Sequence, residues 1–189
     1  GPFFAGPNGL GVLVGVEDSG VDYGHPDFLD ASGNTRFVNV WDQSDPVGPS
    51  PPAFGYGSEW TSADLDANVA RQTDDDGHGT HVMGIAAGDG SGTGGAIPAF
   101  TYSGMAPRAD LLMVKTDLTD TGVLDGVAYA FERATALGKP AVVNLSLGSL
   151  YGPKDGTSPF EAAIDALAGP GRIVVAAAGN EGGTGYHAE

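Results

Sequence analysis

The sequence contains no cysteine. A disulfide framework and a thiol nucleophile are therefore both excluded. The absence is compatible with bacterial secretion and equally with the cytosol, so it does not fix the compartment. Any nucleophile in this protein has to be something other than a thiol.

Basic residues are also scarce, since 8 Lys and Arg stand against 24 Asp and Glu and give a formal net charge of −16. Such a surface repels phosphate backbones, so we expect no nucleic-acid partner. A solubilising surface explains the charge, and a calcium-binding or high-salt protein would share it. Because no run approaches the roughly 18 apolar residues that cross a bilayer, no membrane span is expected either.

What the chain does contain is an alternation of short apolar runs and helical patterns, in a length of 189 residues that is typical of one domain. Each run has the length of a strand and is bounded by Gly or Pro, which is the pattern of a buried strand. These runs are residues 11–17, 111–115, 141–147 and 172–178. Strands separated by crossover helices predict an α/β fold, with a mostly parallel sheet and helices on both of its faces.

Helices are expected between these strands. One begins near His78, and a second covers roughly residues 124–137. The third is the best marked, because Ser158 is a natural N-cap, Pro159 occupies the first helical position and Glu161 completes a capping box. Such helices supply the crossover connections that parallel strands need.

Residues 30–75 interrupt this alternation. The segment is rich in Pro, Gly, Asp and aromatic residues and has no clear periodicity. We expect an ordered surface insertion with little regular structure that frames a binding cleft. A Pro-rich ligand for a partner domain is the alternative interpretation.

Polar residues follow three of the predicted strands at their carboxyl ends, where the working groups of parallel α/β sheets collect. Asp18 follows the first strand in "VGVEDSGVD", and Asn180 follows the last one in the Gly-rich turn of "VVAAAGNEGG". A third strand, in "VVNLSLGS", ends at Ser146, Leu147 and Gly148. Between the first and the third lies "DGHGTHV", which contributes two histidines.

Five segments resemble the successive signature blocks of the subtilisin-like serine proteases: "VEDSGVDYGHPDF", "DGHGTHVMG", "GMAPRADLLMVK", "NLSLGS" and "VVAAAGNEGG". They occur in family order over nearly the whole chain. One block such as Asp-Ser-Gly is weak evidence, but five in order are specific. The resemblance implies a subtilisin-like three-layer α/β fold and a serine endopeptidase that acts on polypeptides.

By this resemblance, Asp18 is the triad aspartate, His78 the triad histidine and Asn180 the side chain of the oxyanion hole. Residues 146–148 would form the strand edge that pairs with the substrate. The residue types suit the chemistry, because an imidazole takes the serine proton while a carboxylate fixes its tautomer and stabilises the imidazolium. An amide placed beforehand donates to the tetrahedral oxyanion. No cofactor is required for this catalysis.

The two histidines of "HGTH" raise the alternative of a zinc site. A zincin has its histidines at i and i+4 with a Glu beside the first, whereas here the spacing is i, i+3 and Gly79 takes the Glu position. We therefore interpret His78 as the base and His81 as a structural histidine one turn later. The carboxylates of residues 74–76 favour a helix start and bias His78 towards its charged form.

A structural calcium ion is a second metal to consider. The resemblance makes Asp27 a candidate ligand, but the other ligands have no counterpart in the divergent stretch "GDGSGTGGAIPAFTYSG". The alternative is that Asp27 caps a turn. Asp22 and Glu17 are expected to be surface or hydrogen-bonding groups, and His187 a solvated one.

The nucleophilic serine of the family belongs to a block downstream of the oxyanion asparagine, and no such block occurs here. Ser19 is fixed beside Asp18, while Ser146 and Ser149 belong to the substrate-binding edge, so none of them replaces it. We therefore expect the chain to be the N-terminal two thirds of a peptidase domain whose serine lies beyond residue 189. The chain alone should then be inactive and poorly folded, with the remaining C-terminal part of the domain as its partner.

Two other functional classes compete with a protease. A pseudoprotease, meaning a binding or scaffold module with the same fold, is the first alternative, but the presence of Asp18, His78 and Asn180 argues against it. A nucleotide-binding α/β protein is disfavoured, because the sequence has no P-loop and no Gly-x-Gly-x-x-Gly at the first strand turn. The long 30–75 segment favours a larger, secreted or extracellular parent.

Overall fold

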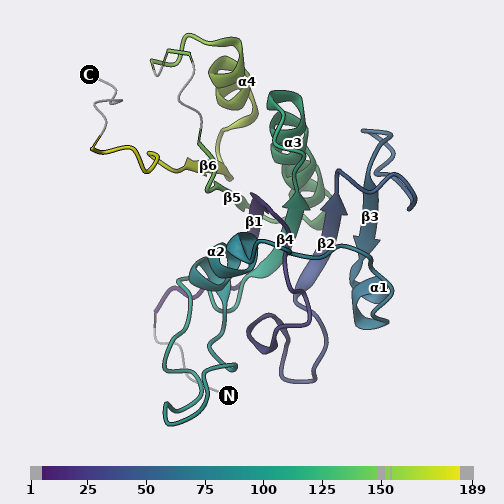
Figure 1. Cartoon of the computed structure of the whole chain (residues 1–189), viewed down its shortest axis with the longest axis vertical. Helices are drawn as coiled ribbons and strands as arrows, with labels where there is room; N and C mark the ends of the chain where they lie inside the picture. The colour runs from purple at the N-terminus through teal and green to yellow at the C-terminus, as the bar shows by residue number, and fades with distance from the viewer. Residues whose placement is uncertain (1–5, 149–151, 154, 184–189) are drawn as a thin grey trace.

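The computed structural model describes residues 6–148, 152–153 and 155–183. In these residues the centre is a six-stranded sheet in the order β3-β2-β4-β1-β5-β6 (Figure 1). Its neighbouring strands are parallel except for the antiparallel pair of β2 and β3. The strands are β1 (Leu13–Asp18), β2 (Phe37–Asp42), β3 (Ser58–Thr61), β4 (Asp110–Lys115), β5 (Ala141–Leu145) and β6 (Arg172–Ala176). The predicted α/β class with a mostly parallel sheet is confirmed.

Helices cover both faces of the sheet (Figure 1). They are α1 (Ser62–Asp66), α2 (His78–Ala87), α3 (Asp120–Leu137), α4 (Pro159–Leu167) and the short 3-10 helix η1 (Pro26–Phe28). α2 packs on one face, and α3 packs on the other with α4 beside it. In the described part of the chain, no helix is long and apolar enough to cross a membrane.

Strand alternation explains how two cores form. Leu111 and Met113 of β4 pack in the core under α2, together with Met83 of that helix. Leu112 and Val114 pack in the core under α3. Successive side chains of a strand point to opposite faces of the sheet. A continuous apolar run therefore buries alternate side chains in the two cores. The runs at 11–17, 111–115 and 141–147 are confirmed as largely buried strands, whereas β6, predicted to be buried from the run at 172–178, is mostly exposed at the end of the sheet.

The helix ends follow the capping signals of the sequence. In α4, the Glu161 backbone N–H donates to the Ser158 hydroxyl over 3.2 Å, and the Ser158 N–H donates to the Glu161 carboxylate over 3.1 Å. This is the predicted capping box. α3 begins at Asp120, earlier than the predicted residue 124, because Thr119 is its N-cap and the polar first turn hides the start from apolar periodicity.

The expectation of little regular structure between residues 30 and 75 is wrong. β2, β3 and α1 all lie in this segment. β2 is an internal strand whose Trp41 is fully buried and contacts the rings of Phe54, Tyr56 and Tyr129. The segment thus extends the sheet and its aromatic residues fill a core. Long-range pairing with β4, which local sequence does not reveal, stabilises this strand.

Glu17 is fully buried between β1 and α3. A Cβ at Gly126 of α3 would come within 2.5 Å of its carboxyl group, so the helix backbone lies directly against it. Because Glu17 is fully buried, the expectation of a surface group is wrong. Strand alternation turns Glu17 towards the face that α3 covers and its neighbour Asp18 towards the other.

Burial raises the pKa of Glu17 well above its ordinary value. The Thr116 side chain offsets part of this rise, and the charges of Asp117 and Asp125 add to it. The carboxyl group therefore tends to stay protonated in the folded protein.

We expect Glu17 to make the protein less stable as the pH rises. Between the ordinary pKa and the raised pKa, the folded state holds a proton that the unfolded state releases, so the free energy of unfolding falls with pH in that window. Glu17→Gln keeps the shape of the side chain but cannot ionise. Within that pH window, the free energy of unfolding of the variant should rise relative to that of the wild type by up to about 1.4 kcal/mol per pH unit. Urea denaturation of the full-length protein over a pH series measures the difference. Asp75→Asn, at an exposed position, serves as control. If the free energies of unfolding of Glu17→Gln and the wild type differ by the same amount at all pH values, Glu17 does not cause the pH dependence.

Candidate active site

The site begins at the carboxyl end of β1. Asp18 is the last residue of this strand and is 1% exposed. Its Oδ1 accepts a hydrogen bond from the Ser19 N–H over 2.7 Å and lies 2.7 Å from Nδ1 of His78. His78 is the first residue of α2, and its side chain is 49% exposed. A buried carboxylate thus holds one nitrogen of a half-exposed imidazole.

This contact decides how the imidazole can act. Because a carboxylate can only accept, Nδ1 of His78 carries the proton and Nε2 is left as the basic nitrogen. The hydrogen bond to Asp18 raises the pKa of His78, as does the charge of Asp18. Burial lowers that pKa somewhat, while the charges of Asp76 and Asp74 raise it further. The predicted bias of His78 towards its charged form therefore follows mainly from Asp18.

Close packing fixes the start of α2 against β1. A Cβ at Gly79 would overlap the carbonyl oxygen of Gly20 and would come within 2.7 Å of Cε of Met113. Gly77 has a different role, because nothing lies near its Cβ position, but its φ of 81° is left-handed. Gly79 therefore allows the close packing, while Gly77 provides the backbone conformation from which the helix begins.

The register of the sheet brings the other predicted segments to the same edge. Glu17 of β1 pairs with Leu145 of β5, and Leu145 pairs with Ala176 of β6. The next residues along the chain, Asp18, Ser146 and Ala177, therefore lie at the same end of these three neighbouring strands. The Ala177 N–H donates to the Leu145 carbonyl over 3.0 Å, which extends the ladder to this edge.

Two predicted site segments follow this edge. Ser146 is half-buried, and its hydroxyl accepts a hydrogen bond from the Asn144 amide over 3.0 Å. Leu147 and Gly148 come directly after it. Asn180 lies in the exposed turn after β6, where its backbone N–H donates to the Glu181 carboxylate over 2.8 Å. Their assignment to substrate binding and to the oxyanion hole stays a prediction. Ser149 and His187 lie outside the described residues.

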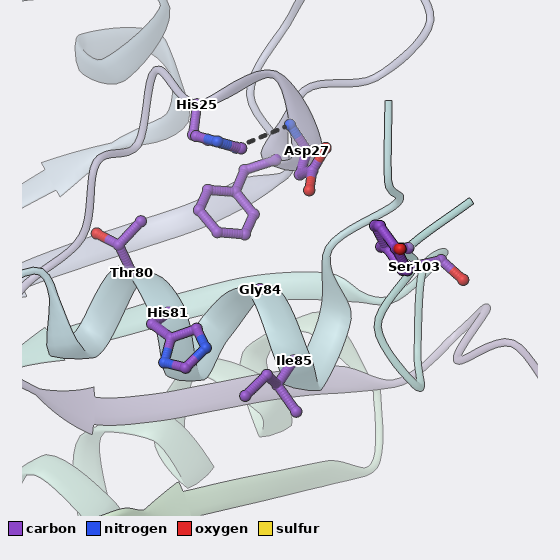
Figure 2. Close-up of a pocket in the computed structure, with 9 residues that line it drawn as sticks. His25, Asp27, Thr80, His81, Gly84, Ile85 and Ser103 are labelled. Atoms are coloured by element: carbon purple, nitrogen blue, oxygen red, sulfur yellow. Dashed lines mark hydrogen bonds between the residues drawn. The ribbon is translucent and has the colours of Figure 1, made fainter. Parts of the chain in front are cut away.

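His81 lies one turn after His78 on the exposed side of α2. It lines a cavity of about 320 Å³ together with Thr80, Gly84 and Ile85 of the same helix, opposite the segment of His25. Figure 2 shows this arrangement, with His25 and His81 on opposite sides. Because Asp18 contacts His78, the geometry favours His78 over His81 as the base.

Asp27, the candidate calcium ligand, lies in η1 beside the same cavity. Its N–H donates to Nδ1 of His25 over 3.2 Å, and its Oδ1 accepts from the Gly92 N–H over 2.5 Å. The described residues nowhere group three His, Asp or Glu side chains suited to a metal ion. Metal binding at Asp27 stays a prediction.

Comparison with known proteins shows the family to which the chain is similar. A profile of the subtilase family matches residues 9–189. Subtilisin from Bacillus sp. strain TA39 is 34% identical over 179 residues, which cover 92% of this chain and 35% of that protein. The subtilisin-like protease PopC of Myxococcus xanthus is 30% identical over 195 residues, which cover 94% and 35% respectively. The chain thus spans about a third of the length of these curated relatives.

Solved structures have the same fold. The CspB protease of Clostridium perfringens has a TM-score of 0.78 and is 30% identical, over 93% of this chain and 37% of that one. Sphericase has a TM-score of 0.65 and is 29% identical, over 93% of this chain and 48% of that one. Both comparisons confirm the expected three-layer architecture for the described part of this chain.

Proposed function

Because the chain belongs to the subtilase family, we propose that it is the N-terminal part of a serine endopeptidase domain with Asp18 and His78 as two members of its triad. The observation that carries the proposal is the 2.7 Å contact between Asp18 Oδ1 and His78 Nδ1. It leaves Nε2 free on a half-exposed ring, which is where a serine hydroxyl has to arrive.

Each residue has a defined part in peptide-bond hydrolysis. Nε2 of His78 accepts the proton of the serine hydroxyl as the serine oxygen attacks the substrate carbonyl carbon, and Asp18 stabilises the imidazolium. The imidazolium then donates this proton to the leaving amine nitrogen. A water molecule, activated in turn by His78, hydrolyses the acyl-enzyme. Asn180 donates a hydrogen bond to the oxyanion of both tetrahedral intermediates.

The nucleophilic serine is proposed to lie beyond residue 189. Two described serines near the site are already engaged: the Ser19 hydroxyl donates to Asp74 and accepts from the Gly79 N–H, and the Ser146 hydroxyl accepts from Asn144. Neither is held against Nε2 of His78. The remaining part of the domain is the proposed partner, and a polypeptide is the proposed substrate.

The outer end of the sheet offers a surface for that partner. β6 pairs with β5 on one side, and its Ile173 and Val175 are about half exposed. α4 has apolar residues that pack only partly, including Phe160 and Ile164. Such unpaired apolar surface is what a further part of the same domain would cover.

We expect the chain of residues 1–189 by itself to hydrolyse nothing. Its described residues hold the proposed base and orienting carboxylate, while the hydroxyls of Ser19 and Ser146 make hydrogen bonds to other groups. Incubation with casein and with a fluorophosphonate probe measures turnover and covalent labelling, and the full-length protein is the positive control. Labelling of the short chain would contradict the proposed position of the serine.

The pseudoprotease remains the alternative function, and the same assay decides between the two. A full-length protein that is folded but neither cleaves casein nor reacts with the probe would be a binding module. We also propose a secreted or extracellular location, with which the lack of cysteine is compatible.

A further inference from the structure

We propose that Asp74 is a positioning residue that holds His78 against Asp18, an inference that rests on the proposed function. Asp74 lies in the segment before α2 and is partly buried. In the described part of the chain, no hydrogen bond or ion pair joins Asp74 to the imidazole of His78. It acts instead through the residues on either side of His78 and through the residue after Asp18.

One carboxylate oxygen of Asp74 connects the strand end to the helix start. Oδ1 accepts from the Ser19 hydroxyl over 2.7 Å and from the Gly77 N–H over 3.0 Å. The same Ser19 hydroxyl accepts from the Gly79 N–H over 3.0 Å. Ser19 follows Asp18, while Gly77 and Gly79 flank His78. Both members of the proposed dyad are thus tied to one oxygen through their chain neighbours.

The second oxygen fixes the first turn of α2. Oδ2 of Asp74 accepts from the Thr80 N–H over 2.8 Å and from the Thr80 hydroxyl over 2.6 Å. The Thr80 hydroxyl in turn accepts from the Asp22 N–H over 2.8 Å. This hydrogen bond connects the first turn of α2 to the segment that follows β1. Asp74 therefore caps a helix whose N-cap residue, Gly77, has no side chain to do so.

Four donors fill the acceptor capacity of this one carboxylate. Burial raises the pKa of Asp74, but the hydrogen bonds from Thr80 and Ser19 outweigh it and lower that pKa below its ordinary value. Asp74 is therefore charged and fully engaged. An asparagine at position 74 would place its NH₂ group, which is a hydrogen-bond donor, against groups that are also donors. At least one hydroxyl or N–H would then lose its partner.

Asp76 provides the matched control for charge. It is exposed, and its charge raises the pKa of His78 more than that of Asp74 does. If Asp74 acted on His78 by charge alone, Asp76→Asn would have at least the effect of Asp74→Asn. If Asp74 acts by positioning, the order is reversed, because only Asp74→Asn loosens the hydrogen bond between His78 and Asp18.

The test compares Asp74→Asn with Asp76→Asn in the full-length protein. We expect Asp74→Asn to lower kcat by about 10- to 100-fold with KM changed less than about twofold, since a misplaced base affects the chemical step. Asp76→Asn should leave kcat within about threefold. The acid limb of the kcat/KM profile should move to lower pH in Asp74→Asn, and further than in Asp76→Asn, because the pKa of His78 falls when its contact with Asp18 weakens. Equal shifts, or a larger one in Asp76→Asn, would refute the proposal.

A second measurement separates this proposal from the proposed function. NMR titration of the His78 ring reports its pKa whether or not the protein cleaves peptides. A lower pKa of His78 in Asp74→Asn than in Asp76→Asn supports the positioning role of Asp74 even in an inactive protein. The reverse order of the two pKa values overturns the proposal. Should Asp74→Asn fail to fold, Thr80→Val removes one donor to Asp74 at nearly constant volume, and the same comparison with Asp76→Asn applies.

Discussion

Replacing His78 with alanine in the full-length protein is expected to abolish nearly all turnover while the fold persists. Without the imidazole, no group takes the proton from the serine, and loss of the base from such a triad lowers kcat by about 10⁶-fold. The side chain is 49% exposed, so its removal creates little internal void. Steady-state kinetics and a thermal melt on the same preparation measure the two effects separately.

His81→Ala is the matched control for this experiment. It removes the same side chain from the same helix, one turn further on, but leaves the contact between Asp18 and His78 in place. We expect kcat to change less than about tenfold, with any effect mainly on the melting temperature. If His81→Ala damages kcat more than His78→Ala in a folded protein, the base has been assigned to the wrong histidine.

Replacing Asn180 with leucine has the second-largest expected effect, a loss of about 10²- to 10³-fold in kcat, or about 3 to 4 kcal/mol of transition-state stabilisation. Asn180 lies in the exposed turn after β6, at the same edge of the sheet as Asp18. Gly179 beside it has a left-handed φ of 90°, which lets the turn be tight. A tight turn can hold the amide in a fixed orientation before the substrate arrives.

The kinetic signature distinguishes an oxyanion donor from a residue that only supports its turn. A donor that acts on the tetrahedral intermediate lowers kcat with little change in KM, because the ground-state carbonyl needs it little. A turn residue lowers the melting temperature and leaves kcat of the folded enzyme nearly unchanged. An effect confined to KM would remove Asn180 from the proposed mechanism. Asn68→Leu, in an exposed turn with a positive φ of 54°, is a control for the general cost of losing a turn asparagine.

Much of the fold follows from local sequence. The buried strands are visible as continuous apolar runs, and the capping box of Ser158 and Glu161 marks the start of α4 as predicted. Two strands, β2 and β3, were not predicted, and β2 has half-buried positions at Val38 and Asn39 and a register irregularity near them. Its apolar pattern is too weak to be recognised locally, because much of its stability comes from pairing with β4 and from aromatic residues that arrive later in the chain.

The candidate site divides in the same way. The sequence by itself predicts Asp18, His78 and Asn180 as site residues, because each lies in a short block that resembles a signature block of the family. It does not reveal that Gly79 excludes any side chain beneath α2, that Glu17 is fully buried, or that Asp74 accepts four hydrogen bonds.

The physical reason is the range of the interactions involved. Helix caps, strand alternation and motif order depend on residues a few positions apart, so the sequence determines them directly. The burial of Glu17 depends on α3, which begins about a hundred residues later. The hydrogen bond from Ser19 to Asp74 joins residues 55 positions apart. Only the tertiary structure decides such contacts, because the packing of α2 and α3 on opposite faces of β1 determines which side chains meet.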